Sequence, residues 1–332
     1  MKKIINNPER VVEEMMEGIV AAYPQYVRKL ENYNVLVRKN SPVEGKVALV
    51  SGGGSGHEPS HGGFVGEGML DAAVAGAVFT SPTPDAIYEA VKNVASDKGA
   101  LLIIKNYTGD VMNFDMAKEM AEMDGIRVES VIVNDDVAVE NSTWTVGRRG
   151  IAGTVFVHKI AGAKAETGAE LDEVKRVTEK VIANVRSMGM ALTPCIVPAA
   201  GKPNFTLDEN EMEIGMGIHG EPGTHRENLK TADEIVEHLM SKILGDINLE
   251  EKDDVAVMIN GLGATPLMEL FIANRKVDEI LKTRGVRVYR TFVGEFMTSL
   301  EMAGFSISIL KLDDELKELL DAKADTPALK VL

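Results

Sequence analysis

The chain has 332 residues, of which 45% are apolar, so it is long enough for two globular domains of ordinary size. Acidic residues number 51 and basic residues 36, and the resulting net charge of −15 excludes nucleic acid and anionic membrane surfaces as expected partners. No segment approaches the roughly 18 uninterrupted apolar residues of a membrane span, and the N-terminus lacks a signal-peptide core, so a cytoplasmic protein is expected.

The first half of the chain predicts alternating strands and helices. Pro8 opens a helix whose apolar residues recur at helical spacing until Pro24, and Pro84 opens another after the cap residue Thr83. The other expected elements are strands at 34–38, 46–50, 99–105 and 128–133, a strand or short helix within 69–79, and a helix at 112–123. This alternation favours an α/β domain with a mostly parallel sheet, helices on both faces, and ligands at the carboxyl ends of the strands.

The second half predicts a second α/β domain with a mixed sheet. Residues 151–188 have a helical pattern, and we place the domain boundary near residue 185, giving domains at 1–185 and 186–332. Further strands are expected at 190–197, 212–218, 254–260, 286–293 and 305–311. Helices are expected after Thr231, which forms a capping box with Glu234, and after Pro266. A last helix at about 313–322 could pack back on the first domain.

A glycine-rich stretch at 52–63 follows the apolar run 47–50 and is unsuited to a folded core. Glycine lets the backbone approach a ligand closely, so this stretch predicts the first half of a small-molecule site. Its residues 57–61 match the H-E-x-x-H zinc pattern, but Pro59 and the flanking glycines argue against the continuous helix which that pattern requires. The stretch is neither a Walker A motif nor a dinucleotide fingerprint, so nothing supports ATP binding by this chain alone.

Other polar residues have both a structural and a functional interpretation. Asp110 is either the cap of the following helix or a base, and Lys105 is either a solvated lysine, a salt-bridge partner or a ligand-binding cation. Asp135 and Asp136 could bind Mg²⁺, although adjacent acids in such a turn are usually solvated. Residues 260–266 could bind an anion at a helix start, although a tight turn also explains them. The single cysteine, Cys195, excludes an internal disulfide, and its apolar neighbours indicate a buried structural thiol rather than a nucleophile.

His219 is the strongest histidine candidate. A strand at 212–218 would place it on the same face as Gly215 and Gly217, opposite the alternating Met and Ile side chains. A histidine on a face cleared of side chains, before a Gly-Glu-Pro-Gly turn, favours function over a structural role. The contexts of the other histidines are weaker, in helical stretches for His158 and His238 and in a polar loop for His225.

Two glycine-flanked histidine stretches, 52–63 and 215–223, lie either side of Lys105-Asn106-Tyr107-Thr108-Gly109-Asp110. Together with 80–84 and 259–263 they resemble the substrate-binding K subunits of dihydroxyacetone kinases over essentially the whole chain. The resemblance implies a two-domain α/β subunit, usually a homodimer. It also implies that His219 attacks the ketone carbon of dihydroxyacetone to give a covalent hemiaminal. The residues it implies for holding the substrate hydroxyls are Gly54, Ser55, Gly56, His57, Lys105 and Asp110.

The chemistry agrees with these roles. A neutral imidazole is a competent nucleophile toward a carbonyl, and a neighbouring acid must protonate the developing alkoxide, a proton that His57 can supply. Asp110 can accept the proton of the terminal hydroxyl as that hydroxyl attacks phosphorus. The resemblance therefore assigns acid/base roles to both residues.

The resemblance also predicts partners. Single-chain ATP-dependent relatives continue into a nucleotide-binding region, whereas this chain ends at Leu332. We therefore expect no cofactor on this chain, and a companion L subunit that carries ADP or ATP with Mg²⁺ and is rephosphorylated by an M subunit from phosphoenolpyruvate. The family also includes non-enzymatic paralogues that bind dihydroxyacetone and act as coactivators of a transcriptional regulator. The four candidates His57, Lys105, Asp110 and His219 favour the enzyme and leave this alternative open.

Overall fold

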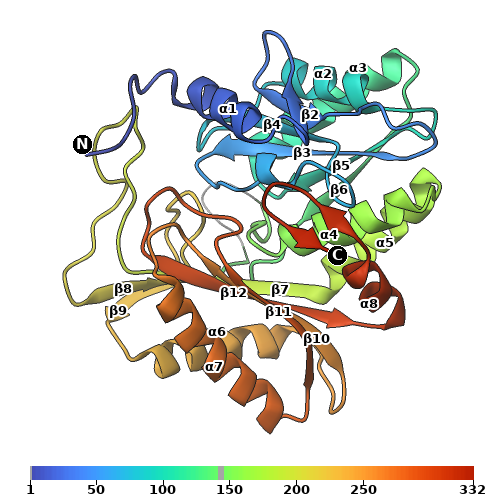
Figure 1. Cartoon of the computed structure of the whole chain (residues 1–332). Helices are drawn as coiled ribbons and strands as arrows, with labels where there is room; N and C mark the ends of the chain where they lie inside the picture. Colours follow the sequence, from blue (N-terminus) through green and yellow to red (C-terminus); the bar gives the residue numbers. More distant parts are fainter. Residues whose placement is uncertain (1, 141–145) are drawn as a thin grey trace.

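The computed structural model describes residues 2–140 and 146–332. Two six-stranded sheets lie one above the other, with helices between them and outside them (Figure 1). The first sheet has the order β1-β2-β4-β3-β5-β6, in which β3 to β6 run parallel and β1 and β2 are antiparallel additions at one edge. Its strands are β1 (Val27–Lys29), β2 (Val35–Arg38), β3 (Ala48–Ser55), β4 (Ala72–Val78), β5 (Ala100–Lys105) and β6 (Val128–Val133).

Helices cover both faces of the first sheet because its strands are apolar on both sides. Along β5, Leu102 and Ile104 pack in the core formed with α2 (Pro84–Val94) and α3 (Thr108–Met123). Leu101 and Ile103 alternate with them and pack in the core that includes α1, α4 and α5. These last helices are α1 (Val11–Ala22), α4 (Thr154–Glu166) and α5 (Leu171–Asn184), and a short 3-10 turn, η1 (Gly62–Phe64), follows the glycine stretch.

The second sheet has the order β11-β10-β12-β7-β8-β9, and only β10 and β11 are parallel neighbours, so it is mixed. Its strands are β7 (Val185–Ala191), β8 (Glu211–Ile214), β9 (His225–Asn228), β10 (Asp254–Gly261), β11 (Arg287–Gly294) and β12 (Gly304–Leu312). α6 (Ala232–Asp246) and α7 (Leu267–Thr283) cover its outer face (Figure 1). The predicted fold class, two α/β units with a mostly parallel and a mixed sheet, is confirmed.

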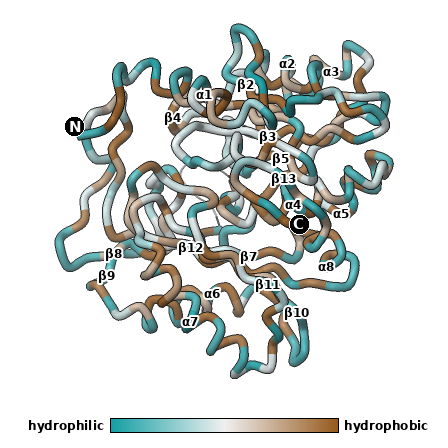
Figure 2. Tube along the Cα trace, viewed as in Figure 1, coloured by the Kyte–Doolittle hydropathy of each residue, from teal (hydrophilic) through white to brown (hydrophobic). Residues whose placement is uncertain are grey.

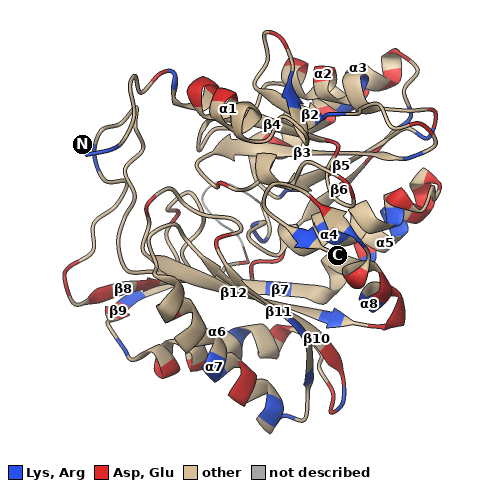
Figure 3. Ribbon diagram, in the orientation of Figure 1, with Lys and Arg blue, Asp and Glu red and all other residues tan. Residues whose placement is uncertain are grey.

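The layer between the sheets is shared. Apolar side chains of α4 and α5 pack in one continuous core with both sheets, including Met258 of β10 and Leu310 of β12. The last helix, α8 (Asp314–Asp321), packs on α4, and the buried Lys159 amine donates to the Leu319 carbonyl at 2.7 Å. The chain ends in a small hairpin of β13 (Ala324–Asp325) and β14 (Lys330–Val331). Apolar residues follow the strands of both sheets (Figure 2), and charged residues gather on the helices and loops (Figure 3).

Several predicted element ends were wrong. The helical pattern expected to continue to residue 188 ends at Asn184, because the next residues form β7 and pair with β12 inside the second sheet. The strand expected at 212–218 ends at Ile214, since Gly215 has a φ of +76° that an extended strand cannot hold. The strand expected at 190–197 ends at Ala191, and the ambiguous segment 69–79 contains the strand β4. Among the described residues, no helix is long and apolar enough to cross a membrane.

Candidate active site

A cleft of about 550 Å³ lies beyond the carboxyl ends of β3 and β5, where the loop between β8 and β9 meets the first sheet. The cleft brings together Gly54, Asp110 and His219, three of the residues predicted for the site. Its other lining residues are Phe79, Thr80, Ser81, Tyr107, Thr108, Gly109, Asn113 and Glu221. The position agrees with the rule that ligands of parallel sheets bind at the carboxyl ends of the strands.

His219 is oriented by a carboxylate. Its Nδ1 lies 2.7 Å from Glu221 Oε1, and its backbone N–H donates to Glu221 Oε2 at 2.9 Å. Burial alone would raise the pKa of Glu221, but the adjacent His219 and Arg149 outweigh it and lower this pKa to about 2. An ionised carboxylate can only accept hydrogen bonds, so Nδ1 of His219 carries a proton, and in the neutral imidazole the lone pair lies on Nε2.

The loop that carries His219 is fixed from beneath by Arg149. This guanidinium is fully buried, donates to the Gly215 carbonyl at 2.7 Å and forms an ion pair with Asp136 at 2.6 Å. Gly217 is required in the same loop, because a Cβ there would lie 2.1 Å from a carboxylate oxygen of Glu221. The loop geometry is therefore determined by a buried ion pair and a glycine.

The acids Asp135 and Asp136 are structural, and the expectation that they are solvated was wrong. Both are fully buried. Asp135 accepts the backbone N–H groups of Ile151 and Gly153 at 2.8 and 2.9 Å, and Asp136 pairs with Arg149. These oxygens thus satisfy buried amides and a guanidinium in the described structure.

His57 lies directly beside His219. The ring centroids are 4.7 Å apart, and Phe79 stacks on His57 at 5.3 Å. His57 Nδ1 donates to the Thr298 carbonyl at 2.8 Å, since a carbonyl can only accept, and Nε2 is buried with no hydrogen-bond partner among residues 2–140 and 146–332. Burial, with His219 and Lys105 nearby, lowers the pKa of His57 well below its usual value. The ring is therefore neutral near pH 7, with an acceptor nitrogen available.

Lys105 and Asp110 form a buried pair at the floor of the site. Lys105 is fully buried, so the solvated interpretation was wrong, and its Nζ lies 3.5 Å from Asp110 Oδ2. Asp110 is the third residue of α3 and not its cap, because the helix begins at Thr108. The helix N-terminus favours a carboxylate there. A Cβ on Gly53 would lie 2.6 Å from Lys105 Nζ, so the glycine is what lets this lysine reach the site.

Ser55 and Gly56 are occupied by structural contacts and do not line the cleft. Ser55 Oγ donates to the Gly76 carbonyl at 2.7 Å. The Gly56 carbonyl accepts the Leu300 N–H at 2.7 Å, from the loop between β11 and β12. Asn260 holds that loop, because its Oδ1 accepts the Phe296 and Met297 N–H groups. Within 260–266, which was considered as an anion site, Asn260 therefore has a structural role. The substrate-binding role of Ser55 and Gly56 stays a prediction.

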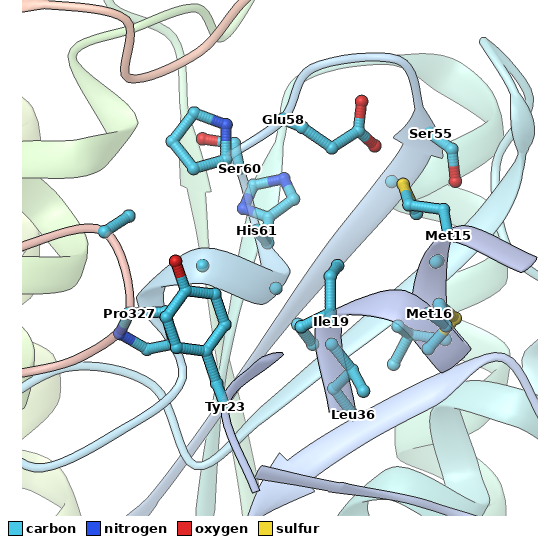
Figure 4. Close-up of a pocket in the computed structure, with 18 of the residues that line it drawn as sticks. Met15, Met16, Ile19, Tyr23, Leu36, Ser55, Glu58, Ser60, His61 and Pro327 are labelled. Atoms are coloured by element: carbon cyan, nitrogen blue, oxygen red, sulfur yellow. The ribbon is translucent and has the colours of Figure 1, made fainter. Parts of the chain in front are cut away.

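A second cavity, of about 390 Å³, lies on the other side of the glycine stretch. Figure 4 shows Met15 and Ile19 of α1 opposite Glu58 and His61. Residues 57–61 are not helical, and His61 Nδ1 lies 2.9 Å from His158 Nε2. The two histidines of this stretch therefore have different partners, the Thr298 carbonyl for His57 and His158 for His61, which agrees with the argument from Pro59 against a zinc motif.

Sequence reasoning missed Glu221, Arg149, Tyr107 and Phe79 as site residues. Tyr107 meets the His219 ring edge-on at 4.6 Å, and its hydroxyl is buried without a hydrogen-bond partner in the described part of the chain. Phe79 meets the same ring at 5.3 Å. The aromatic contacts limit rotation of the His219 ring. Cys195 is buried as predicted, and burial raises the pKa of its thiol to about 11.

Comparisons with known proteins agree with this architecture. The family model described as the Dak1 domain matches residues 17–328. A PTS-dependent dihydroxyacetone kinase 1, dihydroxyacetone-binding subunit, of Listeria innocua serovar 6a is 55% identical over 315 residues, covering 95% of each chain. The dihydroxyacetone kinase of C. freundii, solved with AMP-PNP and Mg²⁺, has a TM-score of 0.92 at 36% identity and covers 99% of this chain. This chain in turn spans 61% of that kinase chain.

A dihydroxyacetone kinase operon co-activator of known structure is also similar, with a TM-score of 0.90 and 36% identity over 95% of this chain and 97% of the co-activator chain. The fold and the cleft define a two-sheet α/β protein with a carboxylate-oriented histidine at its site. The chain belongs to the Dak1 family, and its resemblance to the dihydroxyacetone-binding subunits of dihydroxyacetone kinases is confirmed.

Proposed function

We propose that the chain captures dihydroxyacetone covalently on His219 and presents a substrate hydroxyl for phosphoryl transfer from a companion, nucleotide-bearing subunit. The observation that carries the proposal is the His219–Glu221 pair. It places the proton on Nδ1 and leaves an Nε2 lone pair on a residue that lines the cleft. The 55% identity to a dihydroxyacetone-binding kinase subunit supports the same substrate.

Capture forms one new bond, between His219 and the ketone carbon, and converts the carbonyl oxygen to a hydroxyl. The Nε2 lone pair of His219 forms a bond to the ketone carbon, and the carbonyl π pair moves to oxygen. The imidazole becomes a cation that stands against the ionised Glu221 carboxylate, and the oxygen gains a proton drawn from solvent. His57 Nε2 first accepts this proton and then donates it to the substrate oxygen. It can do both because burial lowers the pKa of His57, so the resting ring is neutral and a proton on it is readily released.

Glu221 acts as a positioning residue for His219. Glu221→Gln is expected to lower the rate of adduct formation by roughly 10²- to 10⁴-fold, as for other replacements of a carboxylate that orients a catalytic imidazole. The reason is that the neutral amide can also donate, so it no longer enforces the Nδ1–H tautomer or neutralises the cation. Stopped mixing followed by mass spectrometry of the intact chain measures the rate. Glu209→Gln, which changes an exposed carboxylate outside the cleft, is the control, and equal rates in both variants would disprove the positioning role.

The phosphoryl donor is proposed to be bound by another subunit. The Listeria innocua relative is named as a subunit of a PTS-dependent kinase, and the sequence of this chain contains no Walker A loop. The chain alone with ATP and Mg²⁺ should therefore produce no dihydroxyacetone phosphate. Addition of the nucleotide-bearing and phosphoryl-carrying subunits of a bacterial dihydroxyacetone kinase, with phosphoenolpyruvate, should restore production. Turnover by the purified chain alone would contradict the proposal.

The same reconstitution can locate the companion subunit. Asn113 of α3 lines the cleft, and the neighbouring Met112 and Met116 are 59% and 53% exposed, so a donor that reaches the cleft passes beside them. Met112→Glu combined with Met116→Glu should slow phosphoryl transfer while adduct formation stays unchanged. Met123→Glu is the matched control, because this methionine is also exposed but lies roughly 16 Å along the helix axis from Met112. The homodimer expected from the resemblance is tested on the same sample by sedimentation velocity.

A coactivator role is the second candidate, because a co-activator structure matches nearly the whole chain. The identity to it is 36%, against 55% to the kinase subunit, which favours the kinase. Adduct formation without phosphoryl transfer in the reconstituted system would support the coactivator instead.

A further inference from the structure

Two histidines and a glutamate outside the cleft meet at the edge of the second sheet. His225 and Glu227 lie on the edge strand β9, and His238 lies on the neighbouring helix α6. One ligand atom from each lies within 4.8 Å of the others. From the sequence, neither histidine was a strong candidate for a site, and His225 was expected in a loop rather than on a strand. The fold brings them together because β9 pairs with β8 beside α6.

The glutamate of this cluster has an oxygen that the protein leaves unused. Glu227 Oε1 is buried and has no hydrogen-bond partner among the described residues. His238 Nδ1 lies 3.5 Å from it and His225 Nε2 lies 3.8 Å from it. The other oxygen, Oε2, is occupied by the Lys230 amine. This buried carboxylate oxygen faces two imidazole nitrogens but forms a hydrogen bond with neither of them. Such an arrangement suits a metal ion that all three atoms would bind.

The protonation of His225 is determined by Thr224. Thr224 Oγ1 donates to the Ile214 carbonyl at 3.2 Å, so it accepts from His225 Nδ1, which lies 2.9 Å away. Nε2, the atom that faces Glu227, therefore carries the lone pair. An outer hydrogen bond that fixes the imidazole tautomer in this way is typical of histidines that bind metals.

We propose that His225, Glu227 and His238 bind a zinc ion. Two imidazoles and one carboxylate form a donor set that zinc uses, with the fourth position left for water. Ligand atoms on a tetrahedral zinc ion are about 3.3 Å apart for bonds of about 2.0 Å. The separations of 3.5 and 3.8 Å from Glu227 to the two histidines need only small movements, and the two imidazoles, which lie within 4.8 Å of each other, must move closer together. The two imidazoles of the cluster disfavour Mg²⁺ and Ca²⁺, which prefer oxygen ligands.

The ion would fasten β9 to α6 next to the loop that carries His219. That loop ends at Thr224, whose backbone N–H donates to the Ile214 carbonyl at 2.7 Å, and Gly223 N–H donates to Glu213 at 2.9 Å. The proposed site is thus structural, and none of its ligands lines the cleft. It stands independently of the proposed function, so failure of either leaves the other in place.

Zinc titration of the untagged, chelator-treated chain by calorimetry tests the site. One equivalent should bind, raise the unfolding temperature, and give an X-ray absorption spectrum with nitrogen and oxygen ligands at about 2.0–2.1 Å. His225→Ala and His238→Ala should each abolish this binding. Thr224→Val should weaken it by about 10- to 100-fold, because only the outer hydrogen bond is lost.

Two control variants test whether zinc binds at this cluster and not elsewhere on the chain. Glu237→Gln changes a carboxylate of the same helix that pairs with Lys276 instead, and should bind zinc normally. His219→Ala should also bind normally, which excludes the cleft as the source of the signal. Circular dichroism without zinc shows whether each variant is folded. Zinc affinity that is unchanged in folded His225→Ala and His238→Ala overturns the proposal.

Discussion

His219→Ala should abolish covalent retention of dihydroxyacetone and lower phosphoryl transfer in the reconstituted system by at least about 10³-fold, the scale seen when a catalytic nucleophile is removed. The physical reason is that, among the described residues that line the cleft, only His219 combines an imidazole with a carboxylate that can fix its tautomer. Intact-mass spectrometry after rapid quenching measures the adduct. A structure of the wild-type chain soaked with dihydroxyacetone should show continuous density from Nε2 to the carbonyl carbon.

The control for this experiment separates capture from ordinary binding. Glycerol has the hydroxyls of the substrate but no carbonyl, so it should give no adduct with any variant. His225→Ala removes a histidine outside the cleft and should retain the adduct. A crystal of His219→Ala that holds immobile dihydroxyacetone in the same place, with undiminished transfer, would contradict covalent capture.

The fold could be predicted because it depends on local sequence, and local patterns were also the basis for proposing His219 as a site residue. Continuous apolar runs such as 100–105 indicate strands buried on both faces. The glycine stretch 52–63 was expected to be a loop after a strand at 46–50, but its first residues, 52–55, are buried and form the end of β3. His219 was identified from its glycine neighbours although the strand assumed for it ends at Ile214. The expected burial of alternate Met and Ile side chains continues beyond the end of β8, since Met216 and Ile218 are also buried.

The electrostatic arrangement could not be predicted, because it depends on contacts distant in sequence. The tautomer of His57 follows from the Thr298 carbonyl, 241 residues away, and the loop of His219 rests on Arg149. Glu221 lies only two residues from His219, but its contact requires the space that Gly217 leaves. Asp110 was left open between a helix cap and a base, and the cap alternative is wrong because the residue lies inside the first turn of α3. The sequence could not separate the two, since acidic residues are favoured both at a cap and in the first helical turn.

Asp110→Asn should uncouple the two halves of the reaction. Adduct formation on His219 should stay within a few-fold of the wild type, while phosphoryl transfer falls by roughly 10²- to 10⁴-fold, the usual contribution of a general base. The reason is position: Asp110 lines the same cleft at the N-terminus of α3, where it can accept the hydroxyl proton as oxygen attacks phosphorus, whereas Glu221, which also lines the cleft, is paired with His219. The amide keeps the shape of the side chain but cannot take that proton.

A structural role for Asp110 would give a different pattern. Because Asp110 pairs with the fully buried Lys105, its loss could also disturb the floor of the cleft, and then adduct formation would fall together with transfer. Lys105→Met, which removes the other member of the pair, distinguishes the two cases: it should impair substrate retention, whereas Asp110→Asn should not. Comparison of the adduct rate with the transfer rate in the two variants therefore identifies Asp110 as the base only if transfer alone is lost.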